Sequence, residues 1–540
     1  MNEFDFIIVG GGTAGCVLAN RLSADPSNRV LLIEAGHDRP TRAMQIPLFF
    51  SKVSADPKLG WNFMADAEPH AGGRALAIKR GKLIGGSSAI NGLAYTRGHP
   101  ADYDGWADAG AAGWRYEDVL PYFRRVETNW RGESTTHGGD GPMPVSRYPR
   151  DEKLFAKIAA ATAALGFPAN EDFDANGADG FGCYDTTTRR GRRASAATQY
   201  LDPVRHRSNL TIRTEALVTK ILTEGRRAIG VEHERGGKLE RVKARREVLV
   251  CGGTYNSPHL LMLSGIGPGE ELSALGIPVV QDLPGVGLNL QEHPVIGAMF
   301  RCNDMFQFDR DMRFDRLALS LLRWRLFGTG LLSGVPLGGV GFFRSTPELQ
   351  RPDVEVAFVT SSFEARPWFP LLRSARGQMI WCCTWLLAPK SRGRVRLRSP
   401  DPRDHPTILH NLLAEPSDVD SLRGALENIR AIAATAPLSG LIEGETLPGP
   451  DVRTEQEIEN YLRTTAVPGA HPTSTCAMGD GAQAVTDAEL RVRGMERLRV
   501  IDASVMPKVV AAHTNAATLM IAERGADLVL GQTIRAVEPA

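Results

Sequence analysis

The sequence lacks the features of several specialised classes of protein. Its 540 residues include only seven cysteines and no Cys-x-x-Cys pair, which argues against a disulfide framework and favours a reducing cytoplasm. Charge of neither sign is in excess, with 63 Lys and Arg against 62 Asp and Glu. This balance indicates neither a nucleic acid nor an acidic membrane surface as a partner. The sequence also shows no internal repeat and no low-complexity tract.

Long apolar runs are missing as well. The most apolar candidate, LLSGVPLGGVGFF, is short, rich in glycine and preceded by Arg323 and Arg325, so we expect no transmembrane segment. The first predicted strand follows MNEF directly, which leaves no room for a signal peptide. The length and a hydrophobic content of 42% predict a globular protein of two or more domains, with Cys382 and Cys383 in a core.

The N-terminal stretch FDFIIVGGGTAGCVLANRLS carries the first functional motif. Residues 6–9 predict a buried strand and residues 16–22 predict a helix. Between them, Gly10, Gly12 and Gly15 form a GxGxxG pattern. The first glycine allows a tight turn, the second lets the backbone approach a pyrophosphate, and the third lets the helix pack on the strand. The N-terminus of the helix then offers free N–H groups to the pyrophosphate.

An acidic residue at the end of the next strand supports the same interpretation. The stretch VLLIEAG predicts a strand that ends in Glu34, nineteen residues after Gly15. A carboxylate there accepts hydrogen bonds from an adenosine ribose and repels the extra phosphate of NADP. These features predict a dinucleotide-binding protein, and they do not separate NAD from FAD.

Glycine and small residues recur in two later stretches. Residues 81–106, GKLIGGSSAINGLAYTRGHPADYDGW, predict a loop whose free N–H groups suit an anion or a flat ring. In EVLVCGGTYNSPHLLMLSGIG, a strand runs into Gly252 and Gly253, and Ser257 and Pro258 predict the cap and first residue of a helix.

The C-terminal stretch LRVIDASVMPKVVAAHTNAATLMIAERGADLVLG predicts a strand, a loop and an amphipathic helix that opens near Asn515. Together the blocks resemble the glucose–methanol–choline (GMC) oxidoreductase family, which binds FAD. Four blocks in the family's order carry the resemblance, with GVGLNLQEHP as a weaker fifth: GGGTAGCVLANRLS with IEAG, GKLIGGSSAINGLAYTRG, GGTYNSPHLLMLSGIGP, and HPTSTCAMG with VIDASVMP and HTNAATLMIAE. The resemblance implies that the dinucleotide is FAD and that Glu34 is its ribose ligand.

The resemblance also implies an α/β fold, α+β overall, with a Rossmann-like FAD-binding domain and a second substrate domain built on an antiparallel sheet packed by helices. The expected segments are residues 1–154, 193–294 and 466–540 for the FAD-binding domain, and residues 155–192 and 295–465 for the substrate domain. Within the latter, residues 393–411 predict two strands joined by a Pro/Asp turn, and residues 419–438 predict a long amphipathic helix.

Two histidines head family blocks, His471 in AHPTSTCAMG and His513 in AAHTNAAT. In related proteins these positions face the reactive side of the flavin, so the resemblance assigns His471 as the catalytic base and His513 as its partner. A free imidazole with a pKa near 6.5 is mostly unprotonated at neutral pH, which suits removal of a hydroxyl proton. A structural role is the alternative for each. Other histidines lie in surface-like or loop sequences and are not expected in the site: His37, His137, His206, His233, His99 and His293.

The same resemblance predicts the contacts with FAD. The cofactor-binding residues expected are Gly10, Gly12, Thr13, Ala14, Gly15, Glu34, Ala35, Trp61, Arg80, Gly85, Gly86, Ser87, Asn91, Gly92, Ala94, Val218, Gly252, Asp502, Ala503, His513, Asn515 and Thr518. Some relatives attach FAD covalently through a histidine in the SSAIN region. Here Ile90 precedes Asn91 and no histidine is nearby, so we expect non-covalent FAD and no metal.

Two departures from the family pattern bear on the substrate. Choline-oxidising relatives usually have asparagine at the position of His513, whereas the glucose-oxidising branch has histidine. Choline-type members also carry a glutamate before a Gly-Gly-Phe segment, where Gly338 stands in PLGGVGFFRS. We therefore expect no carboxylate to balance a cation there, and do not expect choline as the substrate. Candidates to line an apolar cavity are Trp368, Phe369, Trp381 and Trp385.

The sequence thus predicts an FAD-dependent oxidase or dehydrogenase. It would oxidise a neutral or aromatic primary alcohol to the aldehyde, by proton abstraction at His471 and hydride transfer to the flavin, with oxygen or a quinone as acceptor. The alternative is a lyase on the same scaffold, of the hydroxynitrile-lyase or photodecarboxylase type, although His471 argues against the latter. The SSAIN and HTN blocks contradict an NAD-dependent dehydrogenase.

Overall fold

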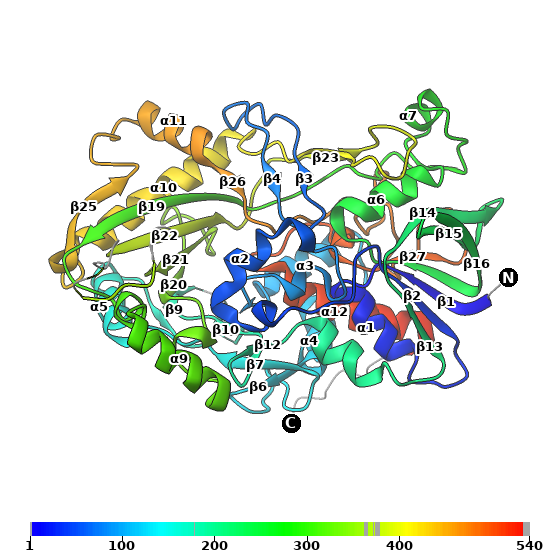
Figure 1. Ribbon diagram of the computed structural model, residues 1–540. Helices are drawn as coiled ribbons and strands as arrows, with labels where there is room; N and C mark the ends of the chain where they lie inside the picture. Colours follow the sequence, from blue (N-terminus) through cyan, green and yellow to red (C-terminus); the bar gives the residue numbers. More distant parts are fainter. Residues whose placement is uncertain are drawn as a thin grey trace.

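Two large β-sheets carry the architecture, and helices pack against them (Figure 1). The computed structural model describes residues 3–175, 177, 179–360, 366–370, 372 and 378–532. The mixed α/β fold class predicted from the sequence is confirmed. In the described ranges, no helix is both long and apolar enough to cross a membrane.

The first sheet has seven strands and contains the N-terminal strand. β1 pairs in parallel with β2 and β16, while β16, β15 and β14 form an antiparallel meander. β2 also pairs with β13, and β16 with β27, both in parallel. The strands are β1 (Glu3–Val9), β2 (Val30–Ile33), β13 (Leu210–Arg213), β14 (Ala216–Glu224), β15 (Arg227–Arg235), β16 (Lys238–Val250) and β27 (Leu498–Val500). β2 is buried throughout, as expected for an apolar run in the parallel part of a covered sheet.

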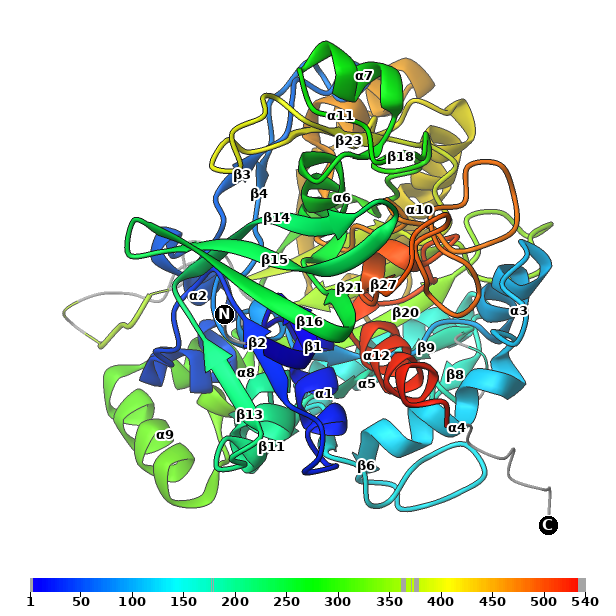
Figure 2. The same ribbon diagram turned by 90° about the vertical axis from the view of Figure 1, so that its right-hand side faces the viewer.

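Two helices from opposite ends of the chain lie side by side next to this sheet (Figure 2). They are α1 (Thr13–Leu22), which packs on β1 and β2, and α12 (Thr514–Leu530), and both were predicted. α1 follows β1 closely because Gly15 has no side chain: a Cβ there would lie 1.9 Å from the carbonyl oxygen of Gly10. The third glycine of the motif therefore packs helix on strand.

The helix α6 (Gly253–Leu263) begins five residues before the predicted start. The prediction of a cap at Ser257 and a first helical residue at Pro258 is wrong. The Ser257 hydroxyl instead donates to the carboxylate of Asp502 at 2.5 Å. Pro258 is tolerated inside the helix because the carbonyl that it cannot bond, that of Thr254, accepts a threonine hydroxyl from a neighbouring loop.

The second sheet has the order β25–β19–β22–β21–β20–β9–β8, with β26 paired to β19. Its neighbours run antiparallel except β8 and β9, so the predicted antiparallel sheet is confirmed. The strands are β8 (Ala169–Asn170), β9 (Gly180–Gly182), β19 (Pro294–Cys302), β20 (Leu337–Phe343), β21 (Val354–Val359), β22 (Met379–Leu386), β25 (Ile442–Leu447) and β26 (Val467–Pro468). Cys382 and Cys383 are buried in β22 as expected, and all seven cysteines are free.

Three helices pack against this sheet, α5 (Glu152–Ala164), α10 (Pro416–Ala434) and α11 (Glu455–Thr465). α10 is the predicted long amphipathic helix, and it begins three residues earlier than expected. The predicted strand pair also forms, as β23 (Arg394–Arg396) and β24 (Thr407–Leu409), but it stands apart from the large sheet.

The remaining elements connect these layers or lie at their edges. The helices are α2 (Phe50–Ser54), α3 (Pro100–Asp108), α4 (Tyr116–Val126), α6 (Gly253–Leu263), α7 (Gly269–Ala274), α8 (Gln307–Asp311) and α9 (Phe314–Phe327). The short strands are β3 (Phe63–Met64), β4 (Ala77–Ile78), β5 (Ala94–Tyr95), β6 (Glu127–Asn129), β7 (Met143–Arg147), β10 (Asp185–Thr186), β11 (Thr188–Arg189), β12 (Arg192–Arg193), β17 (Ile266–Gly267) and β18 (Gln281–Asp282). Single-turn helices include η4 (Gly86–Ala89), η7 (Leu331–Ser333) and η9 (Ala503–Val505).

The two large sheets take their strands from different parts of the chain. The first uses residues 3–33, 210–250 and 498–500, and the second uses residues 169–182, 294–386 and 442–468. This alternation parallels the predicted domain segments, whose boundaries stay a prediction.

Candidate active site

A cavity of about 1560 Å³ extends from the carboxyl ends of β1 and β2 to the inner face of β21 and β22. It is lined by His471 and His513 and by every predicted cofactor-binding residue except Gly15 and Gly85. A Cβ added at Gly15 would point at the carbonyl of Gly10, and one added at Gly85 would point at Ala197. The sequence blocks therefore meet around one space, although they are hundreds of residues apart.

Glycines leave room for a cofactor at one end of this cavity. A Cβ added at Gly12 or at Gly253 would meet no atom within 4 Å, so it would project into the cavity itself. Gly86 has a φ of +51° and approaches the backbone of Gly12 so closely that its Cβ would lie 2.8 Å from the Gly12 Cα. This cradle fits a group that presses flat against backbone, as a dinucleotide does.

Two helix N-termini converge on the same end. The Thr13 hydroxyl, at the start of α1, donates to the Asn515 side-chain oxygen at the start of α12, over 3.0 Å. Both residues line the cavity. The positive ends of two helix dipoles therefore face the space where a pyrophosphate or another negative group would lie.

Glu34 is buried at the edge of this cradle. Its Oε2 accepts the N–H of Gly11 and its Oε1 accepts the N–H of Gly36, each at 2.7 Å. Burial raises the pKa of this carboxyl, and the two backbone bonds and Lys82 offset only part of the rise. A carboxylate has about four acceptor positions, so two remain for a ribose.

Two donor atoms of Arg80 lack an acceptor in the described chain. Its Nε and Nη2 are buried, line the cavity wall and have no hydrogen-bond acceptor among the described residues. Buried donors without acceptors are costly, on the order of 1–3 kcal/mol each. Arg80 thus fits an acceptor supplied by a bound group, and the residues present fit FAD.

The two predicted catalytic histidines lie together at the other end of the cavity. Nε2 of His471 is 3.0 Å from Nδ1 of His513, and the ring planes are nearly perpendicular, at 87°. His513 precedes α12, and His471 follows β26. Burial, together with repulsion from a protonated His513, holds the pKa of His471 well below 6.5. His471 is therefore a free base at neutral pH.

A third histidine, His293, completes a row that the sequence did not anticipate. Its Nδ1 lies 3.1 Å from Nδ1 of His471. Burial lowers the pKa of His293 to about 3, so this ring stays neutral. The preceding residue, Glu292, accepts the backbone N–H of His471 at 2.7 Å. The interpretation of His293 as part of a loop motif missed this contact, since QEHP and AHPT are 178 residues apart.

A carboxylate stands behind His513, where the sequence predicted none. Oε1 of Glu355, on β21, lies 3.1 Å from Nε2 of His513, and its side chain is 1% exposed. The expectation built on Gly338 is wrong because that residue faces the other way: a Cβ there would lie 2.7 Å from Leu154 of α5. The signal for Glu355 is a lone acidic residue in the apolar strand VEVAFV.

An aromatic wall borders the histidines. Trp385 and Tyr184 pack edge-on to the imidazole of His513, with ring centroids 5.7 Å and 5.3 Å away. Trp381 also lines the cavity because alternate residues of β22 face it. The expectation for Trp368 and Phe369 is wrong: neither reaches the cavity, and the indole of Trp368 donates to the carbonyl of Asp309.

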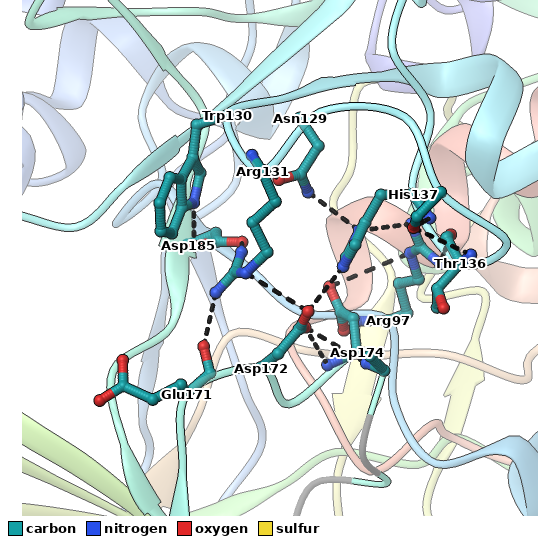
Figure 3. Close-up of polar contacts among 12 residues, drawn as sticks. Arg97, Asn129, Trp130, Arg131, Thr136, His137, Glu171, Asp172, Asp174 and Asp185 are labelled. Atoms are coloured by element: carbon teal, nitrogen blue, oxygen red, sulfur yellow. Dashed lines mark hydrogen bonds and ion pairs between the residues drawn. The ribbon is translucent and has the colours of Figure 1, made fainter.

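A buried polar network lies next to this wall (Figure 3). Arg97 donates to Glu127 at 2.6 Å, with both side chains fully buried. The His137 ring lies 3.0 Å from Glu127 and 2.8 Å from Asp172. Burial would lower the pKa of His137, but Asp172 and Glu127 raise it to about 9. The expectation of a surface position is wrong for His137, because its loop folds inward onto Arg97.

Two residues that are next in sequence to members of this network contact His513. Thr96, which precedes Arg97, accepts the backbone N–H of His513 at 3.4 Å. Tyr184, whose ring packs on His513, precedes Asp185, and Trp130 donates to Asp185 at 2.8 Å (Figure 3).

Two further histidines were predicted at the surface, and one of the two predictions is correct. His206 is exposed, as expected. His233 is fully buried, which contradicts its predicted surface position, because its ring points inward toward Arg213.

The glycine cradle and the pair of imidazoles are the features of a dinucleotide-dependent oxidoreductase. Comparison with known families identifies the family of such enzymes to which the chain belongs. A family model described as GMC oxidoreductase matches residues 4–295, and its C-terminal counterpart matches residues 389–522. The chain belongs to the GMC oxidoreductase family, as the sequence predicted. It is an FAD-dependent oxidoreductase that acts on CH–OH groups.

Similar proteins cover nearly the whole chain. The mitochondrial choline dehydrogenase of Homo sapiens is 38% identical over 98% of this chain and 90% of its own length. The oxygen-dependent choline dehydrogenase of Pseudomonas fluorescens is 39% identical over 98% and 94%. Among solved structures, pyridoxine 4-oxidase from Mesorbium loti has a TM-score of 0.86 and 32% identity, covering 97% of this chain and 98% of that one. A formate oxidase variant from Aspergillus oryzae has a TM-score of 0.90 and 27% identity, covering 98% of each.

Proposed function

We propose that this protein oxidises a primary alcohol to the aldehyde, with His471 and His513 handling the hydroxyl proton. The observation that carries this proposal is the 3.0 Å contact between Nε2 of His471 and Nδ1 of His513 at the cavity wall. A hydroxyl group placed at this contact can give a proton to one ring and accept a hydrogen bond from the other. FAD, when bound, accepts the hydride that leaves the carbon.

The contacts around the pair suggest how its protons are arranged. Glu355 accepts from Nε2 of His513, and a proton on Nδ1 of His513 would lie between that atom and Nε2 of His471, where a hydroxyl oxygen placed beside the pair can also accept it. Nδ1 of His471 then donates to Nδ1 of His293, which leaves Nε2 of His471 free as the base. In this arrangement His513 stabilises the developing alkoxide, and His471 takes its proton, as the sequence predicted.

Choline is the first substrate candidate, and its support comes from two sources. The curated relatives named above are choline dehydrogenases. In the structure, the rings of Trp385 and Tyr184 stand beside the histidines with the buried carboxylate of Glu355 behind them. Aromatic faces and a negative charge attract a quaternary ammonium group.

A neutral or aromatic primary alcohol, which the sequence predicted, is the second candidate. Its support is the apolar lining of the same wall, which includes Leu337, Val359 and Trp381. Glu355 does not itself line the cavity and is engaged by His513. Glu292, which does line the cavity, accepts the backbone N–H groups of His293 and His471.

An anaerobic alcohol panel tests the proposal. The purified FAD-loaded protein is mixed with choline, benzyl alcohol and pyridoxine, and loss of the flavin absorption is followed. Bleaching by at least one alcohol supports oxidation, and the ratio of kcat/KM values ranks the substrates. No bleaching by any primary alcohol would argue against the proposed reaction. Peroxide and artificial-acceptor assays run in parallel report whether oxygen or a quinone-like acceptor is used. A cytoplasmic location stays part of the proposal, supported by seven unpaired thiols.

A further inference from the structure

The helix α9 presents an apolar face to solvent. It lies at the edge of the molecule in both views (Figures 1 and 2). Six of its large apolar side chains are between 50% and 71% exposed: Phe314, Leu319, Leu321, Leu322, Leu326 and Phe327. Leu319, Leu322 and Leu326 follow helical spacing and form one stripe along the helix. Single exposed apolar residues are ordinary on a protein surface, but several gathered on one helix mark an interaction site.

A neighbouring segment extends this face. The backbone N–H of Phe314 donates to the carbonyl of Trp368 at 2.9 Å, which brings Trp368 next to the start of α9. Close to Trp368 in sequence, Phe369 is 40% exposed and Leu372 is 83% exposed.

The fold uses only a narrow strip of α9. Ser320 and Trp324 are its buried residues, and the indole of Trp324 donates to the carbonyl of Gly191 at 2.7 Å. Trp324 packs with Ile46 and Leu332 in a small separate cluster. The helix is therefore fixed to the body along one side, and the six side chains named above face away from it.

The charged residues on this surface are mostly basic. Arg316, Arg323 and Arg325 are exposed, and none of them forms an ion pair within the described residues. The acidic residue of the helix, Asp315, is already paired with Arg313 at 2.6 Å. The balanced charge of the whole sequence therefore hides a local excess of positive charge around an apolar face.

We propose that α9, with Phe369 and Leu372, docks this protein on an anionic lipid bilayer. A helix with a stripe of bulky apolar residues and arginines beside it lies in the plane of the interface. In α9 the stripe is Leu319, Leu322 and Leu326, and Arg316 and Arg323 lie beside it. Arginine also reaches along an apolar surface and keeps its charge at the headgroups, which suits Arg325 within the face. At 14 residues the helix is about 21 Å long, which suits lying on a bilayer.

A second copy of this chain fits the same face less well. In a symmetric dimer built on α9, the unpaired Arg316, Arg323 and Arg325 of one copy would approach those of the other, since the same patch faces itself. Repulsion between these like charges opposes that contact, whereas anionic headgroups neutralise them.

The docked surface would lie next to the catalytic cavity. Leu317 of α9 and Met312, just before it, line that cavity. Membrane contact would therefore place lipid against the outside of one cavity wall, whichever alcohol the enzyme oxidises.

Vesicle sedimentation of the FAD-loaded full-length protein tests the proposal. We expect it to sediment with phosphatidylcholine vesicles that contain phosphatidylglycerol, to bind pure phosphatidylcholine more weakly, and to be released by salt. Each arginine near an anionic surface contributes roughly a fivefold factor to partitioning, so R316Q/R323Q/R325Q should bind roughly a hundredfold more weakly.

Apolar variants separate insertion from charge attraction alone. L322Q/L326Q should lower partitioning at least roughly tenfold while FAD content and alcohol oxidation stay at the wild-type level, since glutamine is a good helix former. The matched control is Leu239→Gln, which removes a leucine that is 63% exposed on β16 and should leave partitioning unchanged.

Three results would overturn the proposal. One is absence of binding to either vesicle. Another is unchanged binding by both α9 variants. The third is a stable dimer, seen by analytical ultracentrifugation, that L322Q/L326Q dissociates, which would show that a second copy covers this face.

Discussion

Nε2 of His513 lies 3.1 Å from Oε1 of Glu355, so a buried carboxylate stands directly behind the histidine pair. Among the described residues, neither of the two forms a second ion pair. The carboxylate can hold a proton on Nε2 of His513 and orient the ring, and Nδ1 then faces His471. Glu355 is a positioning residue, since it does not line the cavity.

Glu355→Gln should slow alcohol oxidation without loss of cofactor. Glutamine keeps the shape of the side chain but removes the charge that balances a proton on His513. We expect flavin bleaching to slow roughly ten- to a hundredfold, a part of what a positioned acid–base group contributes. Anaerobic rapid mixing measures this rate, and the absorption ratio of flavin to protein measures FAD content. A wild-type bleaching rate in the variant would rule out the positioning role.

FAD should leave the polypeptide on denaturation. Ile90 lies at the end of the η4 turn beside Asn91, where the SSAIN block carries no histidine to form a bond with the flavin. Acid precipitation of the purified protein should therefore release all of the yellow colour into the supernatant. Colour that remains in the washed pellet would show a covalent bond.

Glu34→Ala should weaken FAD binding by about 1.5–3 kcal/mol, the worth of a hydrogen bond to a charged group. The same change leaves the N–H groups of Gly11 and Gly36 without their acceptor, so the unfolding temperature should fall too. Glu34→Gln is the matched control, because its amide oxygen still accepts one of these bonds. Titration of the stripped protein with FAD measures the dissociation constant. Equal FAD affinity in Glu34→Ala and the wild type would contradict the assignment.

The stability of the protein should depend on pH through His137. Its pKa is raised to about 9 in the fold, above the value of 6.5 for a free histidine, by Asp172 and Glu127 against the effect of burial. The stabilisation is therefore fully present below pH 6.5 and is lost as the pH rises through 9.

His137→Gln should accordingly lower the free energy of unfolding more at pH 6 than at pH 10, by roughly 1–3 kcal/mol. Urea unfolding of the FAD-saturated protein at both pH values measures the difference. His206→Gln, at an exposed histidine, is the control and should change little. The same loss at both pH values would mean that His137 is not charged in the fold.

Sequence reasoning found the parts of the site that are encoded in continuous stretches. Gly10, Gly12 and Glu34 belong to one strand–turn–helix–strand unit, so their spacing alone predicts a cradle. His471 and His513 head recognisable blocks, and the structure brings them to 3.0 Å.

The missed residues depend on contacts between distant strands. Glu355 is 158 residues from His513 and reaches it only because β21 pairs with β22 and turns one face to the cavity. The sequence pattern predicts that Gly338 faces the cavity, but its strand turns this position toward α5. A strand buried on both faces gives no alternation from which to read its orientation. Such residues become visible only with the register of the sheet.

The division of labour between His471 and His513 gives the last prediction. Burial and the neighbouring rings hold the pKa of His471 well below 6.5, so it remains a free base over the whole neutral range. His471→Ala removes that base, and only water or His513 could then take the hydroxyl proton. Flavin bleaching by the alcohol should slow roughly 100-fold or more.

His513→Asn should be milder than His471→Ala, because an asparagine amide can still donate to the developing alkoxide. FAD content should stay near the wild-type level in both variants, since the cradle around Gly12 and Glu34 is untouched. Anaerobic rapid mixing of each variant with the best alcohol of the panel measures bleaching directly. If His471→Ala bleached at the wild-type rate while His513→Asn did not, His513 would be the base, with Glu355 balancing the proton it gains. If neither variant slowed, the proton acceptor would lie elsewhere, and both histidines would be structural.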